Sequence, residues 1–154
     1  METPTNGRPL AVIERIRRAV NEHDLDALAT CFHPDYLSEQ PIHPDRAFRG
    51  RDQMRKNWDQ IFASVPDIRA EVLRCAAEGN IVWTEWDLRG TRVDGVPSHT
   101  AMVTIGEVRD EQIVWMRLYM EQVQEGEGID AAVRASLGGG DGVLQAPRSA
   151  GGAR

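Results

Sequence analysis

Two acidic residues stand between two tryptophans in the stretch VWTEWDLRG, which runs from Val82 to Gly90. A carboxyl group packed against aromatic surface has a raised pKa and can act as a general acid. Glu85 and Asp87 are therefore the first residues to consider for catalysis. The alternative is that they lie on the solvent-exposed side of an ordinary strand, and the surrounding elements decide between the two.

Alternation along this strand separates the acids from the second tryptophan. Successive side chains of a strand point to opposite faces, so Trp86 shares a face with Thr84 and Leu88, while both acids point the other way. We expect the apolar face to pack on helices and the charged face to meet solvent. The two acids are then predicted to form cross-strand ion pairs with Arg117 on a nearby strand.

The last strand-like run, QIVWMRLYMEQV, divides in the same way. The residues expected to face the helices are Val114, Met116, Leu118 and Met120. The residues expected on the opposite face are Trp115, Arg117, Tyr119 and Glu121. Solvent does not explain aromatic side chains on a charged face, so we expect this outer face of the sheet to form a homodimer interface, where aromatic residues concentrate.

Helices are predicted before the strands. Pro9 suits the start of a first helix, and Asp24 is expected to cap a second helix that Pro34 ends. A short edge strand is expected over residues 36–40, and a third helix follows Gly50. Four strand-like runs close the domain at residues 68–78, 80–93, 98–109 and 112–123. Helices followed by a block of antiparallel strands predict an α+β fold.

Composition limits the possible partners of the protein and its cellular compartment. The chain has 154 residues, of which 41% are hydrophobic and 27% charged, with a formal net charge of -6. We expect no nucleic-acid partner, because no basic stripe is present, and no membrane contact, because no apolar run approaches about 20 residues. Cys31 and Cys75 are interpreted as reduced, buried thiols of a cytoplasmic protein.

Three regions are expected along the chain. Residues 1–8 form a flexible leader, residues 9–124 form the folded domain, and residues 125–154 form a Gly/Ala-rich tail that is predicted to hold a short helix at 129–137.

Several phrases, in their order, resemble the nuclear transport factor 2-like superfamily and, within it, the SnoaL-like (polyketide cyclase-like) branch. They are VNEHDLDALATCFHPDY, FRG, VPDIRAEV, GNIVWTEWDLRGTR and QIVWMRLYMEQV. The resemblance implies a cone-shaped α+β barrel, in which three N-terminal helices pack on a strongly curved antiparallel sheet around an internal pocket. Its members include cyclases, ketosteroid isomerases, epoxide hydrolases, dehydratases and non-catalytic binding domains, so the fold alone does not decide the function.

Two catalytic patterns of this superfamily are incomplete here. The tyrosine position of the ketosteroid isomerase pattern is Ile16, and its general-base position is Gln40, which cannot abstract a proton at neutral pH. The three polar positions of the epoxide hydrolase pattern correspond to Trp86, Leu88 and Leu118, which are apolar. We therefore do not expect these residues to catalyse ketosteroid isomerisation or epoxide hydrolysis.

The resemblance to the cyclases leaves four catalytic candidates. Glu121 stands near the position of the cyclase acid at the end of the last strand, and Glu39 stands where a histidine is common. Gln40 is expected to bind substrate or water by a hydrogen bond, and His99 is considered as an acid or base near the mouth of the cone. No spacing of His, Asp or Glu predicts a metal site, and no cofactor is expected.

The pocket is expected to be mostly apolar, with adaptable thioether and aromatic side chains. Its predicted lining is Ile16, Val20, Tyr36, Trp58, Phe62, Thr84, Trp86, Leu88, Met102, Thr104, Met116, Leu118 and Met120. One hypothesis is a cofactor-independent cyclase, isomerase or dehydratase acting on a hydrophobic, oxygenated, polyketide- or terpenoid-like compound. The other is a non-catalytic ligand-binding or dimerisation module. A carboxylate or histidine projecting into the cone would favour the first, and a lining of Trp, Met, Leu and Thr alone would favour the second.

Overall fold

The computed structural model describes residues 7–138. The chain divides after Val123 into two compact units. The second unit contains helix α4, Ile129–Gly138, where a short helix was expected over 129–137. Residues 1–6 of the expected leader and residues 139–154 of the expected tail lie outside the described part of the chain. No helix of residues 7–138 is long and apolar enough to cross a membrane.

Three α-helices belong to the first unit. They are α1 (Gly7–Asn21), α2 (Leu25–Thr30) and α3 (Arg51–Ser64), and a short 3-10 helix, η1 (Pro44–Arg46), precedes α3. Asp24 caps α2 as predicted, because its side chain accepts a hydrogen bond from the backbone N–H of Ala27 at 3.0 Å. Pro9 lies in the first turn of α1, as predicted, whereas the predicted end of the second helix at Pro34 is wrong, because α2 ends at Thr30.

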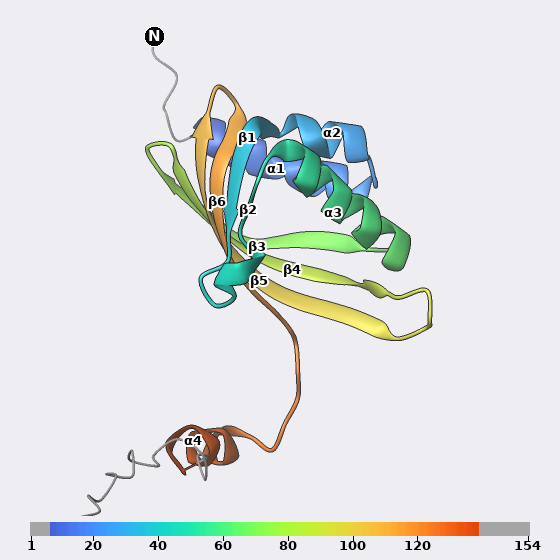
Figure 1. The fold of residues 1–154 in the computed structure, drawn as a ribbon, viewed down its shortest axis with the longest axis vertical. Coiled ribbons are helices and arrows are strands. Elements are labelled where there is room, and N and C mark those ends of the chain that lie inside the picture. The colour runs from blue at the N-terminus through green and yellow to red at the C-terminus, as the bar shows by residue number, and fades with distance from the viewer. Residues whose placement is uncertain (1–6, 139–154) are drawn as a thin grey trace, which may run out of the picture. The chain divides into compact units, whose positions relative to one another are not determined.

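Six strands form one sheet in the order β2-β1-β6-β5-β4-β3. Their bounds are β1 (Phe32–Glu39), β2 (Phe48–Arg49), β3 (Arg69–Glu78), β4 (Ile81–Thr91), β5 (Pro97–Arg109) and β6 (Gln112–Gln122). The sheet bends strongly, and α1, α2 and α3 gather on one side of it (Figure 1). The α+β cone expected from the sequence is confirmed.

The prediction of a short edge strand at residues 36–40 is wrong. β1 is longer and lies inside the sheet, where it pairs with β2 on one side and runs parallel to β6 on the other. The parallel ladder is interrupted between Phe32 and Leu37, which is where Pro34 lies, so the proline's missing N–H is accommodated at an irregular position. All other strand pairs are antiparallel.

The side chain of Asn21 covers part of the exposed edge of the sheet. Its amide donates to the backbone oxygen of Ala70 at 3.0 Å and accepts from the backbone nitrogen of Ala70 at 2.7 Å. Both backbone groups of this β3 residue are therefore paired, as an edge strand requires to resist further pairing. The same contacts fix the end of α1 against the sheet, and α1 thereby closes one side of the cone.

The sheet face that packs on α1–α3 is called the inner face, and the opposite face the outer face. Val82, Thr84 and Trp86 of β4 are buried on the inner face, whereas Trp83 and Glu85 between them are exposed on the outer face. The face assignment from alternation is thus confirmed for β4. The prediction that Cys75 is buried is wrong, because this β3 residue is partly exposed; both cysteines are free thiols.

Alternation fails at the start of β6. The register with β5 shifts between the pairs Glu107–Trp115 and Val108–Ile113, so Val114 lies in a bulge. Ile113 is fully buried in the core instead of Val114, which was predicted to face the helices. After the bulge the expected alternation resumes, and Met116 is buried.

Candidate functional site

The register of β4, β5 and β6 arranges the inner face in rows across the three strands. From the open end inward, the rows are Leu88–Thr100–Gln122, Trp86–Met102–Met120 and Thr84–Thr104–Leu118. The first row carries two polar side chains, the second consists of one tryptophan and two methionines, and the third has two threonines whose hydroxyls contact Cys75 and Trp86. This arrangement is set by the strand period of two and by the pairing register.

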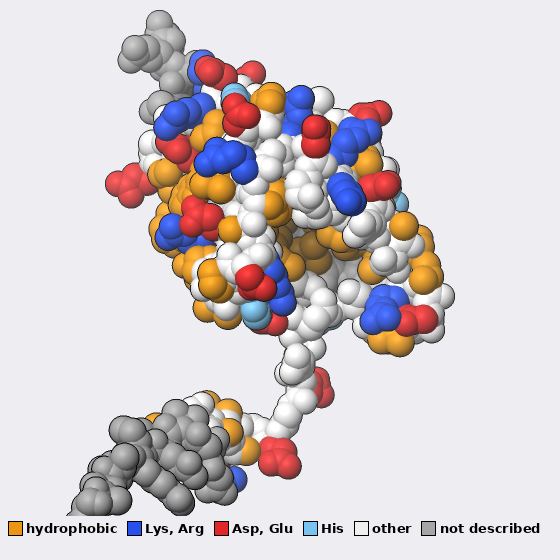
Figure 2. All heavy atoms as spheres, in the orientation of Figure 1, with side chains coloured by type: hydrophobic (Ala, Val, Ile, Leu, Met, Phe, Trp, Pro, Cys, Tyr) orange, Lys and Arg blue, Asp and Glu red, His pale blue; other side chains and the backbone are white. Residues whose placement is uncertain are grey.

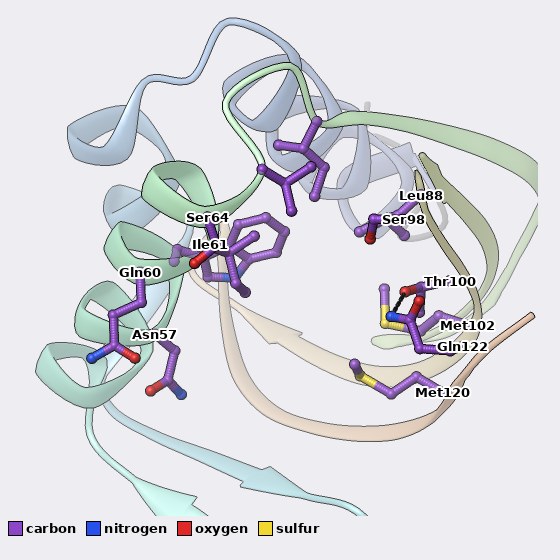
Figure 3. A pocket seen from close by; sticks show the side chains of 13 residues that line it. Asn57, Gln60, Ile61, Ser64, Leu88, Ser98, Thr100, Met102, Met120 and Gln122 are labelled. Atoms are coloured by element: carbon purple, nitrogen blue, oxygen red, sulfur yellow. Dashed lines mark hydrogen bonds between the residues drawn. The ribbon is translucent and has the colours of Figure 1, made fainter. Parts of the chain in front are cut away.

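A pocket of about 460 Å³ lies between α3 and the open ends of β4–β6. Figure 2 shows the molecule hollowed at this side, with hydrophobic side chains inside the hollow. Asn57, Gln60 and Ser64 of α3 line one side of the pocket, and side chains of β5 and β6 line the other (Figure 3). The mouth therefore carries neutral amide and hydroxyl groups.

A smaller cavity of about 40 Å³ lies deeper in the cone. It shares Trp58, Leu88 and Met102 with the pocket, so the two are adjacent, and together they are called the inner chamber. The predicted pocket residues that line the chamber are Ile16, Val20, Trp58, Trp86, Leu88, Met102, Thr104, Met116, Leu118 and Met120.

Three predicted pocket residues lie elsewhere. Tyr36 packs edge-on against an aromatic neighbour on either side in the core, and burial raises its pKa above the ordinary value. Phe62 packs beside Trp58 but does not border the chamber. Thr84 is buried, and its hydroxyl lies 3.4 Å from the thiol of Cys75. These three side chains support the wall rather than form it.

Hydrogen bonds within the wall satisfy its polar groups. The indole N–H of Trp86 donates to the hydroxyl of Thr104 at 3.1 Å. At the mouth, the amide of Gln122 donates to the hydroxyl of Thr100 at 2.8 Å. A buried tryptophan needs such a partner for its N–H, so Thr104 allows Trp86 to lie in the apolar wall.

No ionisable side chain lines the inner chamber within residues 7–138. Its polar groups there are the amides and hydroxyls of Asn57, Gln60, Ser64, Ser98, Thr100, Thr104 and Gln122. A general acid or base must lie within hydrogen-bond reach of the reacting proton. The chamber offers orientation and neutral hydrogen bonds, and it offers no group that titrates near neutral pH.

Two of the catalytic candidates, Glu39 and Glu121, lie on the outer face. Glu39 accepts a hydrogen bond from the indole of Trp115 at 2.6 Å and lies 3.6 Å from the guanidinium of Arg117. Glu121 is exposed at the end of β6, 2.5 Å from the imidazole of His43, and this hydrogen bond lowers its pKa. Their neighbours on the outer face hold both carboxylates away from the chamber.

His99 also lies on the outer face rather than at the mouth of the cone. Its Nε2 is 2.5 Å from one carboxylate oxygen of Asp87, and the guanidinium of Arg89 donates to the other at 2.6 Å. The predicted ion pairs of Glu85 and Asp87 with Arg117 are wrong, because β5 separates β4 from β6.

Gln40 follows β1 and has an unusual environment. Its Oε1 atom is buried and has no hydrogen-bond partner among the described residues. It is not among the side chains that border the inner chamber. Its predicted role as a hydrogen-bonding partner of substrate or water stays a prediction.

The polar residues of the mouth were missed from the sequence. Asn57, Gln60 and Ser64 recur at the spacing of one helical face, and Ser98 and Gln122 continue the inner-face alternation of their strands. The helical spacing and the strand alternation of these residues were therefore visible in the sequence. Polar residues at element ends are usually solvated, so the spacing alone did not distinguish them.

Comparison with solved structures defines the class of protein. IdmH from Streptomyces antibioticus, a candidate polyketide cyclase, is 26% identical with a TM-score of 0.64, covering 73% of this chain and 91% of that one. A loop-truncated IdmH variant is 28% identical with a TM-score of 0.64, covering 73% and 92%. An LEH-like epoxide hydrolase from M. tuberculosis shares the fold at 19% identity and a TM-score of 0.67, covering 77% and 86%. The chain is therefore a nuclear transport factor 2-like cone protein.

The family is defined more narrowly by sequence. The SnoaL-like domain model matches residues 13–116. The chain belongs to the SnoaL-like family. A comparison with the curated proteins found no match.

The outer-face acids predict a contrast in stability. Arg89 first, and His99 second, lower the pKa of Asp87 below its ordinary value of 3.8. We expect Asp87→Asn to lower the free energy of unfolding at neutral pH by about 1 kcal/mol. Glu85→Gln is the control, because Glu85 has no ion pair among the described residues, and we expect a change within about 0.5 kcal/mol.

The pH dependence of this contrast follows from the lowered pKa. The stabilisation by Asp87 is complete above the pKa of the unfolded chain and is lost as the pH falls through the lower pKa of the folded state. The difference between wild type and Asp87→Asn should therefore shrink in acid, as measured by urea unfolding at several pH values. Equal effects of Asp87→Asn and Glu85→Gln at neutral pH would contradict the assignment.

Proposed function

We propose that the protein binds an uncharged, hydrophobic, oxygenated small molecule in the inner chamber. The observation that carries the proposal is the chamber's lining, which has an apolar interior and a mouth of neutral amides and hydroxyls. Ligand sites of this kind bury an apolar body and orient it by a few polar groups. The thioethers of Met102 and Met120 provide an adaptable surface for a bulky ligand.

The neutral lining also limits the charge of the ligand. A charged group that enters an apolar site loses its hydration, and this cost is recovered only by a paired opposite charge. Within residues 7–138 the chamber supplies no such charge. A ligand with carbonyl and hydroxyl oxygens suits this site better than a carboxylate or an amine.

A second candidate function is ring closure of the bound molecule, and the similarity to IdmH favours it. Holding the two ends of a flexible chain in a reactive geometry removes much of the entropic barrier to ring closure. Trp58 and Trp86 form rigid parts of the wall against which such a chain would fold. Under this proposal the chamber contributes orientation, and solvent water, rather than a side chain of the chamber, takes up and returns any proton that the ring closure moves.

We further propose that two copies pair through the outer face. This face exposes apolar side chains from four strands, namely Leu73, Trp83, Val103 and Tyr119, with Trp83 51% exposed. Acidic and basic groups lie among them, because Glu85 is opposite Arg74 in the strand register. A two-fold pairing brings the same patch of both copies together, so a patch with both signs of charge can complement itself. SnoaL-like function in the chamber and pairing on the outer face are thus compatible.

The binding proposal is tested by a matched pair of neighbouring substitutions. Met102→Gln places an amide in the chamber wall, and we expect it to weaken binding of the neutral dye Nile red about tenfold, because the amide must give up water without a partner. Val103→Gln changes the next residue, which faces outward, and should leave binding unchanged. Fluorescence titration measures both. Absence of dye binding to the wild type, or equal loss in both variants, would refute the proposal.

Ring closure by orientation predicts a flat pH profile. With a linear precursor that binds the chamber, kcat should not follow a side-chain titration between about pH 5 and pH 9. Glu121→Gln and His99→Asn should each keep kcat within about twofold, because both residues lie on the outer face. A bell-shaped profile, or a large loss in either variant, would show that an acid or base participates.

Pairing through the outer face is tested by Trp83→Arg. We expect this change to raise the dimer dissociation constant about tenfold or more, since a large exposed aromatic is a typical binding hot spot. Leu10→Arg on α1 is the control, because Leu10 is also exposed but lies on a helix. Sedimentation analysis measures both. A monomeric wild type, or an unchanged Trp83→Arg dimer, would rule the interface out.

A further inference from the structure

We infer that Thr100 and Gln122 bind a carbonyl and a neighbouring hydroxyl of the ligand, so that the chamber selects β-hydroxyketones over simple ketones. The inference rests on the proposed ligand binding in the inner chamber. It concerns the side-chain pair that is hydrogen-bonded to each other at the mouth (Figure 3).

The two side chains form a fixed pair in the chamber wall. Thr100 and Gln122 are direct partners in the register of β5 and β6, and the Gln122 amide donates to the Thr100 hydroxyl at 2.8 Å. Thr100 is only 8% exposed, so the strand and its neighbours hold its hydroxyl in place. Both residues border the pocket. A ligand therefore meets a preorganised pair rather than two independent side chains.

The pair presents hydrogen-bond donors and acceptors side by side to a ligand. When the Gln122 nitrogen donates to Thr100, the threonine O–H remains free to donate and the glutamine oxygen remains free to accept. If the amide is turned round, the threonine O–H donates to the glutamine oxygen. The glutamine N–H and a threonine lone pair are then the free groups. Because the amide carries two N–H groups and the hydroxyl two lone pairs, either orientation leaves at least one donor beside at least one acceptor.

A hydroxyl close to a carbonyl matches this arrangement. The ligand carbonyl accepts from the free donor of the pair, and the ligand hydroxyl donates to the free acceptor. A simple ketone has no hydrogen to donate, and it leaves the acceptor of the pair without a ligand partner. The next row inward consists of Trp86, Met102 and Met120, so the hydrocarbon part of the same molecule continues into apolar surroundings.

The side of the pocket opposite this pair is also neutral. Asn57 and Gln60 of α3 line the pocket on the side away from the strands (Figure 3). Their amides can bind further oxygens of a larger ligand, but they belong to a different element and are not hydrogen-bonded to the pair in the structure. Among the described residues at the mouth, the strand pair combines burial of its hydroxyl with an internal hydrogen bond.

The experiment compares two probes of similar length, 4-hydroxydecan-2-one and 2-decanone, by isothermal titration calorimetry. One additional neutral hydrogen bond corresponds to about a two- to tenfold change in affinity. We expect the wild type to bind the hydroxyketone about two- to tenfold more tightly than the ketone. In the double variant Thr100→Val with Gln122→Met the two probes should bind equally. Thr100→Ser, which keeps the hydroxyl, should keep the preference.

A second double variant provides the matched control. Thr91→Val with Gln112→Met removes a hydroxyl and an amide from β4 and β6 at positions that do not border the chamber, and the preference should persist. Circular dichroism checks that every variant is folded.

The outcomes separate this inference from the proposed function. If the wild type binds both probes with equal affinity, the selection by Thr100 and Gln122 is wrong and ligand binding in the chamber stands. The selection is also wrong if the double variant Thr100→Val with Gln122→Met keeps the preference. If the wild type binds neither probe, the proposed function fails and the inference fails with it.

Discussion

The three helices of the first unit, α1, α2 and α3, pack on the same face of the sheet, and this constraint decides where charge can lie in that unit. Because side chains alternate along each strand, every second residue of β4, β5 and β6 must fit against α1 and α3 or border the chamber between them. A charged side chain there would be buried without a partner, which is strongly unfavourable. The acids of β4 and β6 consequently lie on the outer face, where Asp87 and Glu121 find basic neighbours.

The same constraint explains how polar atoms are tolerated inside. Trp86 lies in the middle of the chamber wall, and its N–H would be unpaired if its cross-strand neighbours were all apolar. Thr104 lies one row deeper on β5 and accepts this N–H at 3.1 Å. Threonine also suits a strand, since its branched side chain packs well on a pleated surface. The chamber thus keeps a large aromatic surface without a charged residue to support it.

The fold and the faces of the strands could be predicted from sequence wherever the ladder is regular. Alternation identified Trp86 as inward and Glu85 as outward, and the structure confirms both. Alternation failed at Val114, because a bulge changes the register there and no residue in the run announces it. The parallel pairing of β1 with β6 could not be predicted from sequence either, because the pairing of residues 32–39 with the last strand depends on the arrangement of the whole sheet.

In the candidate site, too, features that depend on one strand could be predicted, and features that depend on the pairing of separate elements could not. The apolar wall could be anticipated because its residues carry the inner-face pattern of single strands. The contact of His99 with Asp87 could not be, because the two residues lie diagonally across the β4–β5 ladder and meet only in one register. The polar mouth combines α3 with β5 and β6, so its composition emerges only after those elements are placed.

A neutral chamber can still be selective. Discrimination between similar molecules is strongest where a polar group of the site remains unpaired with the wrong ligand, and it is weak where only apolar volume differs. In this protein Trp86, Met102 and Met120 supply the apolar volume. Thr100 and Gln122 in the first row supply hydrogen-bonding groups held by the strands. Selectivity would therefore be concentrated at Thr100 and Gln122, while the Met and Trp side chains below them accept hydrocarbon parts of differing shape.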